Sequence, residues 1–279
     1  MISKLVSIIK ISRPVNVVIT FISVLIAALI CSPGKILEFD IFLAAFAASF
    51  TAVSGNIFND IYDIEIDKIN RPFRPLPSGK LTIKEAYSVI ILFVTLSIFA
   101  SLSIGYFPLV IVLFSHFLLL LYSKYLKRIP LVGNIMVSFL TGLVFVFGGV
   151  VVNNFYAALV PAIFAFLINL IREIVKDMED VEGDKLSGIN TLPIKYGFQK
   201  SKMLVLLITV LLIASTLYPF VSRLYKIEYF VVVMILVNTL LVYCIKILFE
   251  DHSIKNLKKI NNLLKVGMVF GLLAIYLGV

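Results

Sequence analysis

The chain has 279 residues, of which 61% are hydrophobic and 15% are charged. A soluble domain has about 45–50% apolar and about 25% charged residues, so this composition excludes an ordinary soluble protein and a disordered chain. The formal net charge of +9 does not require nucleic acid as a partner, because basic loops that face the cytoplasm and anionic lipid headgroups explain it.

Apolar runs of roughly 16–22 residues, separated by short polar breaks, predict helices that span a bilayer. A membrane β-barrel would instead show alternating segments of about ten residues. The first run follows Lys4, Lys10 and Arg13, and we interpret it as a retained span because no small-residue cleavage site precedes a soluble domain. The predicted spans are residues 15–31, 40–58, 84–103, 106–121, 131–151, 155–175, 203–221, 227–248 and 262–278.

The distribution of Lys and Arg supports nine spans. When the loops are assigned alternately to the two sides, 22 of the 25 Lys and Arg residues fall on one side, and only Lys35, Arg223 and Lys226 fall on the other. Such a bias is typical of loops that face the cytoplasm. We therefore expect a multi-pass protein of the cell membrane with a cytoplasmic N-terminus and an external C-terminus.

Acidic residues are concentrated in two short windows, residues 60–67 and 173–184, which hold ten of the 16 Asp and Glu residues. Each window follows the cytoplasmic end of a predicted span. The same spacing, D-x-x-D-x-x-x-D, occurs in both windows, in Asp60, Asp63 and Asp67 and again in Asp177, Asp180 and Asp184. Steps of three and four residues predict that each triad lies on one face of a continuing helix.

Two such triads repel one another unless a cation lies between them. At about 6 Å and an effective dielectric near 20, each close pair of carboxylates costs roughly 3 kcal/mol. Mg²⁺ prefers oxygen ligands and is usually held by one or two carboxylates together with substrate phosphates. The spacing therefore predicts Mg²⁺ and a diphosphate between the triads, whereas solvated acidic loops are the alternative. Basic residues on the same side are candidate phosphate ligands: Arg71, Arg74, Lys80, Lys127, Arg172 and Lys185.

The two triads are offset by 117 residues, or four spans. An even number of spans per unit predicts a parallel repeat, which places both triads on one side of the membrane. We therefore expect an all-α integral membrane fold with one domain, residues 1–279. Its two four-helix halves would cover roughly 10–128 and 129–250, followed by a ninth helix.

Four segments carry a resemblance to a known family. The segment NIFNDIYDIEIDKINRPFRPLPSGKL (56–81) resembles the first signature of the UbiA-type membrane prenyltransferases, and REIVKDMEDVEGDKLSGINTLP (172–193) resembles their second aspartate motif. YSKYLKR (122–128) is similar to the family's loop between the fourth and fifth helices, and SRPVN (12–16) to its entry into the first helix.

This resemblance implies nine helices around a central cavity that opens laterally to lipid, and Mg²⁺-dependent transfer of a prenyl group from a prenyl diphosphate. It assigns metal–diphosphate binding to all six aspartates of the two triads. It assigns contacts with diphosphate or acceptor to Asn59, Arg71, Tyr122, Lys127 and Arg172, and a place in the cavity wall to Arg13 and Asn16. Within the family, the two motifs look most like those of enzymes that transfer a geranylgeranyl group to the hydroxyl of a glyceryl phosphate lipid in archaeal ether-lipid biosynthesis.

Three other functions remain open from the sequence. An aromatic-acceptor prenyltransferase of quinone biosynthesis would use the same motifs. A transporter would need a polar path, and the middles of the predicted spans carry almost no acids. A CDP-alcohol phosphatidyltransferase would carry a DG-x-x-AR element, whereas Asp63 is followed by Ile64 and no such element follows.

Overall fold

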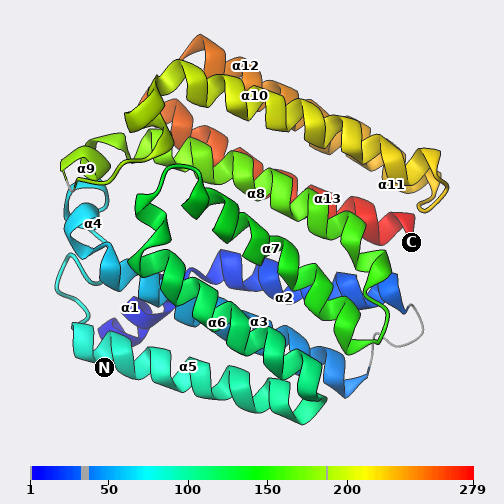
Figure 1. The fold of residues 1–279 in the computed structure, drawn as a ribbon, viewed down its shortest axis with the longest axis horizontal. Helices are drawn as coiled ribbons and strands as arrows, with labels where there is room; N and C mark the ends of the chain where they lie inside the picture. Colours follow the sequence, from blue (N-terminus) through cyan, green and yellow to red (C-terminus); the bar gives the residue numbers. More distant parts are fainter. Residues whose placement is uncertain (1, 33–37, 187) are drawn as a thin grey trace.

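The computed structural model describes residues 2–32, 38–186 and 188–279, which fold as a bundle of long helices (Figure 1). Within these ranges, nine helical segments are long and apolar enough to cross a membrane. They are α2 (Pro14–Cys31), α3 (Phe39–Tyr62), α5 (Ile83–Ile104), α6 (Tyr106–Lys124), α7 (Val132–Val151), α8 (Leu159–Glu179) with the 3-10 turn Tyr156–Ala158 before it, α10 (Leu192–Val221), the continuous run α11 (Ile227–Val232), π-helical turn (Val233–Asn238) and α12 (Thr239–Glu250), and α13 (Ile254–Gly278). The shorter elements are α1 (Ile2–Ser12), α4 (Ile64–Asn70), the 3-10 turn Leu126–Arg128 and α9 (Val181–Leu186).

The nine predicted spans are confirmed, but two of them begin earlier than predicted. Helix α10 begins at Leu192 rather than at 203, and α13 begins at Ile254 rather than at 262. Both extensions are rich in Lys, because hydropathy detects only the part of a helix that lies in the hydrocarbon. Gly197 has φ 86°, which kinks α10 within its extension.

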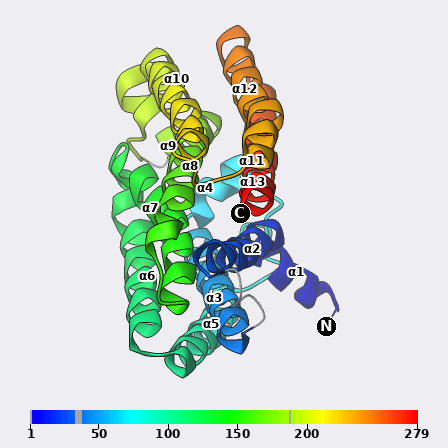
Figure 2. The ribbon, with the colours of Figure 1, turned by 90° about the vertical axis from the view of Figure 1, so that its right-hand side faces the viewer.

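Six of the long helices form a closed ring in which each contacts the next: α2, α3, α6, α7, α8, α13 and back to α2. Helix α5 packs outside α3 and α6, α10 packs outside α8, and α12 packs outside α13 (Figure 2). Helices α2 and α7 also contact each other across the ring. A Cβ atom on Gly148 would lie 2.7 Å from that of Ala27 and 2.8 Å from the carbonyl oxygen of Val24, so glycine permits this close approach.

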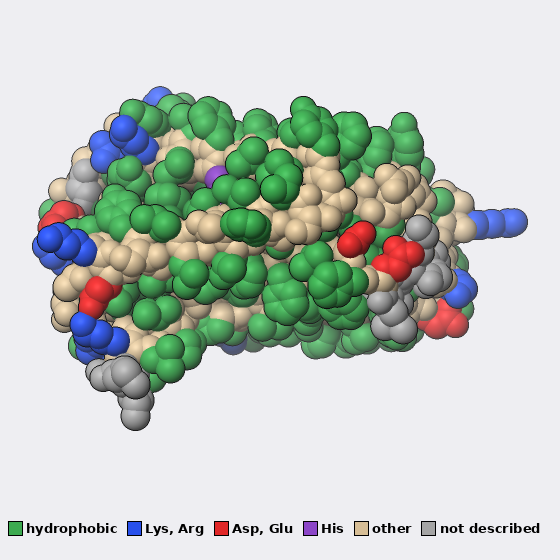
Figure 3. Space-filling model, turned by 90° about the horizontal axis from the view of Figure 1, so that it is seen from below, with side chains coloured by type: hydrophobic (Ala, Val, Ile, Leu, Met, Phe, Trp, Pro, Cys, Tyr) green, Lys and Arg blue, Asp and Glu red, His purple; other side chains and the backbone are tan. Residues whose placement is uncertain are grey.

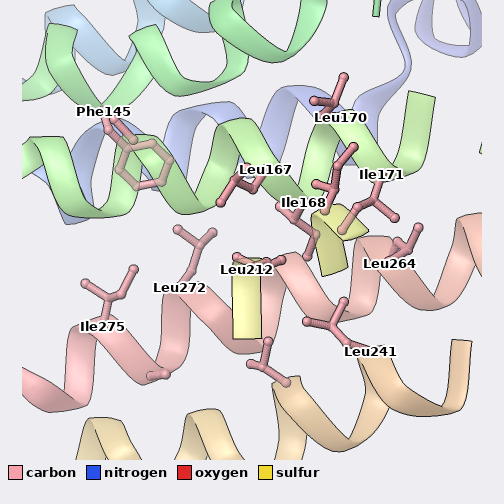
Figure 4. Packing of buried hydrophobic residues seen from close by; sticks show 14 of the residues in the cluster. Phe145, Leu167, Ile168, Leu170, Ile171, Leu212, Leu241, Leu264, Leu272 and Ile275 are labelled. Carbon is pink, nitrogen blue, oxygen red and sulfur yellow. The ribbon is translucent and has the colours of Figure 1, made fainter. Parts of the chain in front are cut away.

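The largest cluster of buried apolar side chains lies on the α8, α10 and α13 side of the bundle. Figure 4 shows Leu167 and Ile168 of α8 facing α13, with Leu272 of α13 and Leu212 of α10 in the same cluster. These side chains pack α8 firmly against its neighbours and therefore fix the position of the second aspartate motif at its end.

The outer surface of the bundle has the distribution of apolar side chains expected of a protein in a lipid bilayer. Figure 3 shows hydrophobic side chains covering the middle of one face, with charged side chains gathered at the two ends. The two chain ends also lie at opposite ends of the molecule (Figure 1), as an odd number of spans requires. Lys35, one of the three basic residues assigned to the external side, lies outside the described residues.

Candidate active site

Both aspartate motifs fold in the same way, as a long helix, a break at the middle aspartate and a short helix. Helix α3 ends at Tyr62, Asp63 has φ −99° and ψ 6°, and α4 follows. Helix α8 ends at Glu179, Asp180 has φ −92° and ψ 6°, and α9 follows. The prediction that each triad lies along a continuing helix is therefore wrong. In the first motif, the middle carboxylate then has a partner of its own, since Asp63 pairs with Lys127 while Asp60 and Asp67 share Arg74.

In the first motif, the outer carboxylates share one partner. Arg74 lies 3.2 Å from Asp60 and 2.6 Å from Asp67, and Arg13 also pairs with Asp60. Arg74 comes from the loop after α4, and Arg13 precedes α2. Burial raises the pKa of Asp67, and Arg74 opposes this shift. Burial would lower the pKa of Arg13, but Asp60, Asp63 and Asp67 together raise it, so this guanidinium stays charged.

The middle aspartate, Asp63, has a different pair of partners. The Asn59 amide donates to its Oδ2 at 2.8 Å, and Lys127 forms an ion pair with the same oxygen. Burial would lower the pKa of Lys127, but Asp63, with the more distant Asp180 and Asp184, raises it overall. The side-chain oxygen of Asn59 is buried and has no hydrogen-bond partner in the described part of the chain.

The second motif is held by other helices. Asn134 of α7 donates to Asp177 at 2.9 Å, and Arg71 pairs with Asp180 at 2.8 Å. Asp184 is buried, and its carboxylate has no hydrogen bond or ion pair with any other described residue. Burial raises the pKa of Asp184 to about 6, although Lys127 opposes the shift.

The structure brings the two motifs together at one end of the molecule, where α4 and α9 lie side by side (Figure 1). Arg71 follows α4 and reaches Asp67 at 3.7 Å in its own motif and Glu179 at 3.4 Å in the other, in addition to Asp180. The Asn70 amide donates to the carbonyl oxygen of Asp180 at 3.2 Å. Two segments that are 110 residues apart are thus joined by direct polar contacts.

The contact between α4 and α9 predicts that substitutions at Gly183 and Asn70 affect stability in a coupled way. A Cβ atom on Gly183 would collide with the Asn70 amide, so we expect Gly183→Ala to break the Asn70–Asp180 hydrogen bond and to lower stability by about 1 kcal/mol. In an Asn70→Ala background, the same change should be neutral or stabilising, because alanine favours a helix over glycine. Unfolding in detergent of the two single variants and the double variant measures this coupling. An equal loss from Gly183→Ala in both backgrounds would exclude it.

The side-chain oxygens of the two aspartate motifs suit a hard cation such as Mg²⁺ that binds phosphate oxygens at the same time. Among the described residues, no three His, Cys, Asp or Glu side chains form a ready-made metal site. Arg13, Arg71, Arg74 and Lys127 instead supply positive charge to the carboxylates. Mg²⁺ in proteins commonly takes only one or two carboxylates, with phosphate and water completing its shell. The oxygens of Asp184 and Asn59, which have no partner in the described residues, suit that role.

A cavity of about 220 Å³ lies within the helix ring and reaches Arg13 and Asn59, which hold Asp60 and Asp63. Five predicted residues line it: Arg13, Asn16, Asn59, Tyr122 and Arg172. Its wall along α6 extends from Tyr122 to Ile111, which is a depth of about 16 Å at 1.5 Å per helical residue. The deep part is lined mainly by apolar side chains of α6 and α7, including Val112, Leu143, Val144 and Phe147.

The structure changes the list of candidate residues in two respects. Lys185 is exposed and does not join the cluster. Asn134, Lys176 and Lys265 were not predicted, although Asn134 binds Asp177 and the two lysines line the cavity. Asn134 and Lys265 lie far from both motifs in sequence, so only the packing of α7 and α13 reveals them. Lys176 lies inside the second acidic window, where its position beside Asp177 was the available signal.

Comparison with known proteins gives a consistent result. The model of the UbiA prenyltransferase family matches residues 20–266. The digeranylgeranylglyceryl phosphate synthase of Methanosphaera stadtmanae is 35% identical, covering 97% of this chain and 98% of that protein. The synthase of the same name from Methanothermobacter thermautotrophicus is 39% identical, covering 97% of this chain and 95% of that protein.

Solved structures show the same fold. One from work on a digeranylgeranylglyceryl phosphate synthase in membranes is 36% identical with a TM-score of 0.74, covering 99% of this chain and 98% of that one. The apo UbiA homologue of Aeropyrum pernix K1 is 17% identical with a TM-score of 0.78, covering 92% and 96%. The UbiA homologue of Archaeoglobus fulgidus bound to GPP and Mg²⁺ is 18% identical with a TM-score of 0.66, covering 97% and 99%.

The resemblance of the two aspartate motifs is thereby confirmed over nearly the whole chain. The family match and the shared nine-helix fold decide against a transporter and against a CDP-alcohol phosphatidyltransferase. This multi-pass membrane protein belongs to the UbiA prenyltransferase family.

Proposed function

We propose that this chain transfers a geranylgeranyl group from geranylgeranyl diphosphate to the free hydroxyl of geranylgeranylglyceryl phosphate, in ether-lipid synthesis. The observation that carries the proposal is its 35% and 39% identity, over 97% of its length, to two synthases named for that product. The cavity supports it, because a polar end, which Arg13, Asn59 and Arg172 line, leads into an apolar chamber among the membrane-spanning helices. Substrates with long apolar tails can thus stay out of water while their headgroups reach the polar end.

The two aspartate motifs would hold Mg²⁺ and the diphosphate through Asp60, Asp63, Asp67, Asp177, Asp180 and Asp184. When bound, Mg²⁺ supplies positive charge to these carboxylates and to the departing diphosphate. Arg13, Arg74 and Lys127 neutralise the same carboxylates in this structure. They would then donate to diphosphate oxygens, as would Arg71. Lys185 is left out of this assignment because it is exposed.

In the transfer step, the allylic carbon–oxygen bond to diphosphate breaks, and its electron pair leaves with the diphosphate. The acceptor hydroxyl oxygen then bonds to the allylic carbon, and its proton passes to the departing diphosphate. The apolar wall, including Val112 and Leu119, excludes water from the allylic cation. Tyr122 is buried in the cavity wall, where its ring face can stabilise that positive charge. Asn16 and Asn59 can orient the headgroups.

The raised pKa of Asp184 predicts a pH dependence of Mg²⁺ activation. A carboxyl with a pKa of about 6 is mostly protonated at pH 5 and mostly ionised at pH 7. We expect the half-saturating Mg²⁺ concentration to rise as the pH falls through 6, because a protonated carboxyl is a poor metal ligand. Mg²⁺ titrations of activity between pH 5 and 8 measure this, with Asp184→Asn expected to flatten the curve. A pH-independent half-saturation in the wild type would contradict the assignment.

We further propose that the site faces the cytoplasm and that the chain is one domain of two parallel halves, roughly 10–128 and 129–250. The bias of 22 out of 25 Lys and Arg residues supports the orientation. The same helix–break–helix geometry at Asp63 and at Asp180 supports the repeat.

The acceptor is tested by presenting radiolabelled geranylgeranyl diphosphate to the purified protein with different acceptors in parallel. We expect product with geranylgeranylglyceryl phosphate and none with 4-hydroxybenzoate, a phenolic acid. Transfer only to the phenolic acid would overturn the proposed acceptor and would favour an aromatic-acceptor prenyltransferase.

A further inference from the structure

One wall of the cavity carries more positive than negative charge. Arg172 and Lys176 of α8 both pair with Glu173, at 2.5 Å and 3.1 Å. Lys265 of α13 lines the same cavity and lies within electrostatic range of these three side chains. Within the described residues, Lys265 has no hydrogen bond or ion pair. Three cations therefore share one carboxylate on this wall.

Lys265 takes no part in the ion pairs of the aspartate cluster among the described residues. Arg13 pairs with Asp60, and Lys127 pairs with Asp63, whereas Lys265 has no carboxylate of its own. Lys265 is partly buried and lies about 16 Å along α13 from Ile254, among apolar turns of the helix. A lysine in such a place is costly to keep without an anion. The excess of positive charge on this wall therefore suits a further anionic group.

The same face of α13 continues into a second, smaller cavity of about 80 Å³. Met268, one turn beyond Lys265, lines both cavities, as do Ile19, Ser23 and Thr141. The second cavity is almost entirely apolar, and Figure 4 shows five of its lining residues, Phe145, Ile168, Leu212, Leu272 and Ile275. Gly271 also lines it, and a Cβ atom there would meet no atom within 4 Å.

Lys265, Met268, Leu272 and Ile275 follow one another at steps of three and four residues, so they form one stripe along α13. Gly271 borders this stripe, three residues after Met268. A positive charge at one end and an apolar cavity at the other match an amphiphile with an anionic head and a hydrocarbon tail. The prenyl diphosphate is also such a molecule, but its headgroup belongs with the aspartates and Mg²⁺. Two anionic headgroups in one cavity need two separate positive subsites, because they would otherwise repel each other.

We propose that this stripe of α13 is the acceptor site. Lys265, with Lys176 and Arg172, binds the phosphate monoester of the acceptor lipid, and the isoprenoid tail passes Met268 into the small cavity beside Gly271. This inference rests on the proposed function, since it places the acceptor of that reaction. It assigns acceptor recognition to Lys265 and tail recognition to Gly271.

The headgroup part is tested by steady-state kinetics of Lys265→Met with geranylgeranyl diphosphate and geranylgeranylglyceryl phosphate. We expect the KM for the acceptor to rise roughly 10- to 100-fold, as for a lost charged hydrogen bond, while the KM for the diphosphate stays within about twofold. Lys265→Arg should restore most of the affinity. Lys258→Met, at an exposed lysine two turns earlier in α13, is the matched control and should change neither constant.

A rise in the KM for the diphosphate alone would place the donor headgroup at Lys265 and overturn the proposal, as would unchanged constants. Each variant is compared with a wild type that prenylates this acceptor. A wild type that does not use the acceptor would refute the proposed function itself. Failure of the acceptor site and failure of the proposed function are therefore distinguishable.

The tail part is tested with Gly271→Leu, which fills the small cavity from a position with open space. We expect roughly a tenfold rise in the KM for geranylgeranylglyceryl phosphate. The KM for an acceptor with a ten-carbon geranyl tail should change much less, because the short tail does not reach the filled space. An equal change for both acceptors, or no change for either, would show that the tail lies elsewhere.

Discussion

Replacing Asp63 by Asn is expected to lower prenyl transfer by at least about 10²–10³-fold, because it removes a negative oxygen where the metal–diphosphate charge must be held. Asp63 is buried, and its carboxylate contacts both Lys127 and Asn59, a residue that lines the cavity. Asp180→Asn should have the same effect, since Asp180 occupies the equivalent break of the second motif. Initial rates with radiolabelled geranylgeranyl diphosphate measure both losses.

Two nearby acids serve as matched controls. Glu65 lies on α4 with its side chain 77% exposed, and Glu182 lies on α9 and is also exposed. We expect Glu65→Gln and Glu182→Gln to retain nearly full activity.

The Asn variant at Asp63 leaves Lys127 buried without its ion pair, which costs stability. Asp63→Asn combined with Lys127→Met removes that cost, so inactivity of a well-folded double variant would separate chemistry from folding. Near-normal turnover in Asp63→Asn would remove this residue from the mechanism.

Chelation of divalent metal is the second change with a large expected effect. We expect EDTA to abolish prenyl transfer and added Mg²⁺ to restore it, because the carboxylates and the diphosphate cannot share one site without added positive charge. Turnover at a series of free Mg²⁺ concentrations measures this. The control is thermal unfolding in EDTA, which should be nearly unchanged, since arginine and lysine side chains already neutralise the aspartates in this structure. Full activity in EDTA would show that the aspartates serve another purpose.

The spans could be predicted from the sequence because each is a long apolar run, and that property is local. The basic bias then fixed the number of spans, so even the turn at Gly105, which carries no charge, was correctly placed between α5 and α6. The amphipathic helix α1 was not predicted, although Leu5 and Ile9 are exposed on one side while Ile11 is buried. Its apolar face is too short to be detected as a span.

Interactions that depend on the meeting of distant helices could not be predicted. The spacing of Asp60, Asp63 and Asp67 fits a straight helix, whereas in the structure the helix breaks at Asp63. The ion pairs with Arg74 and Lys127 depend on distant segments that the spacing does not reveal. The π-helical turn at Val233–Asn238 has no marker in the sequence, although Asn238 in the structure donates to Thr216 of α10 at 3.2 Å. Such partners are fixed by tertiary packing rather than by local preference.

In the proposed mechanism, both aspartate motifs hold one prenyl diphosphate headgroup through shared divalent metal. The most direct measurement is a structure of this protein with a non-hydrolysable geranylgeranyl diphosphate analogue and Mn²⁺, whose anomalous signal locates the metal. We expect metal peaks at the headgroup contacted by carboxylates of both motifs, from Asp60 or Asp63 on one side and from Asp180 or Asp184 on the other. Metal bound by one motif alone, or a headgroup bound away from the junction of α4 and α9, would contradict it.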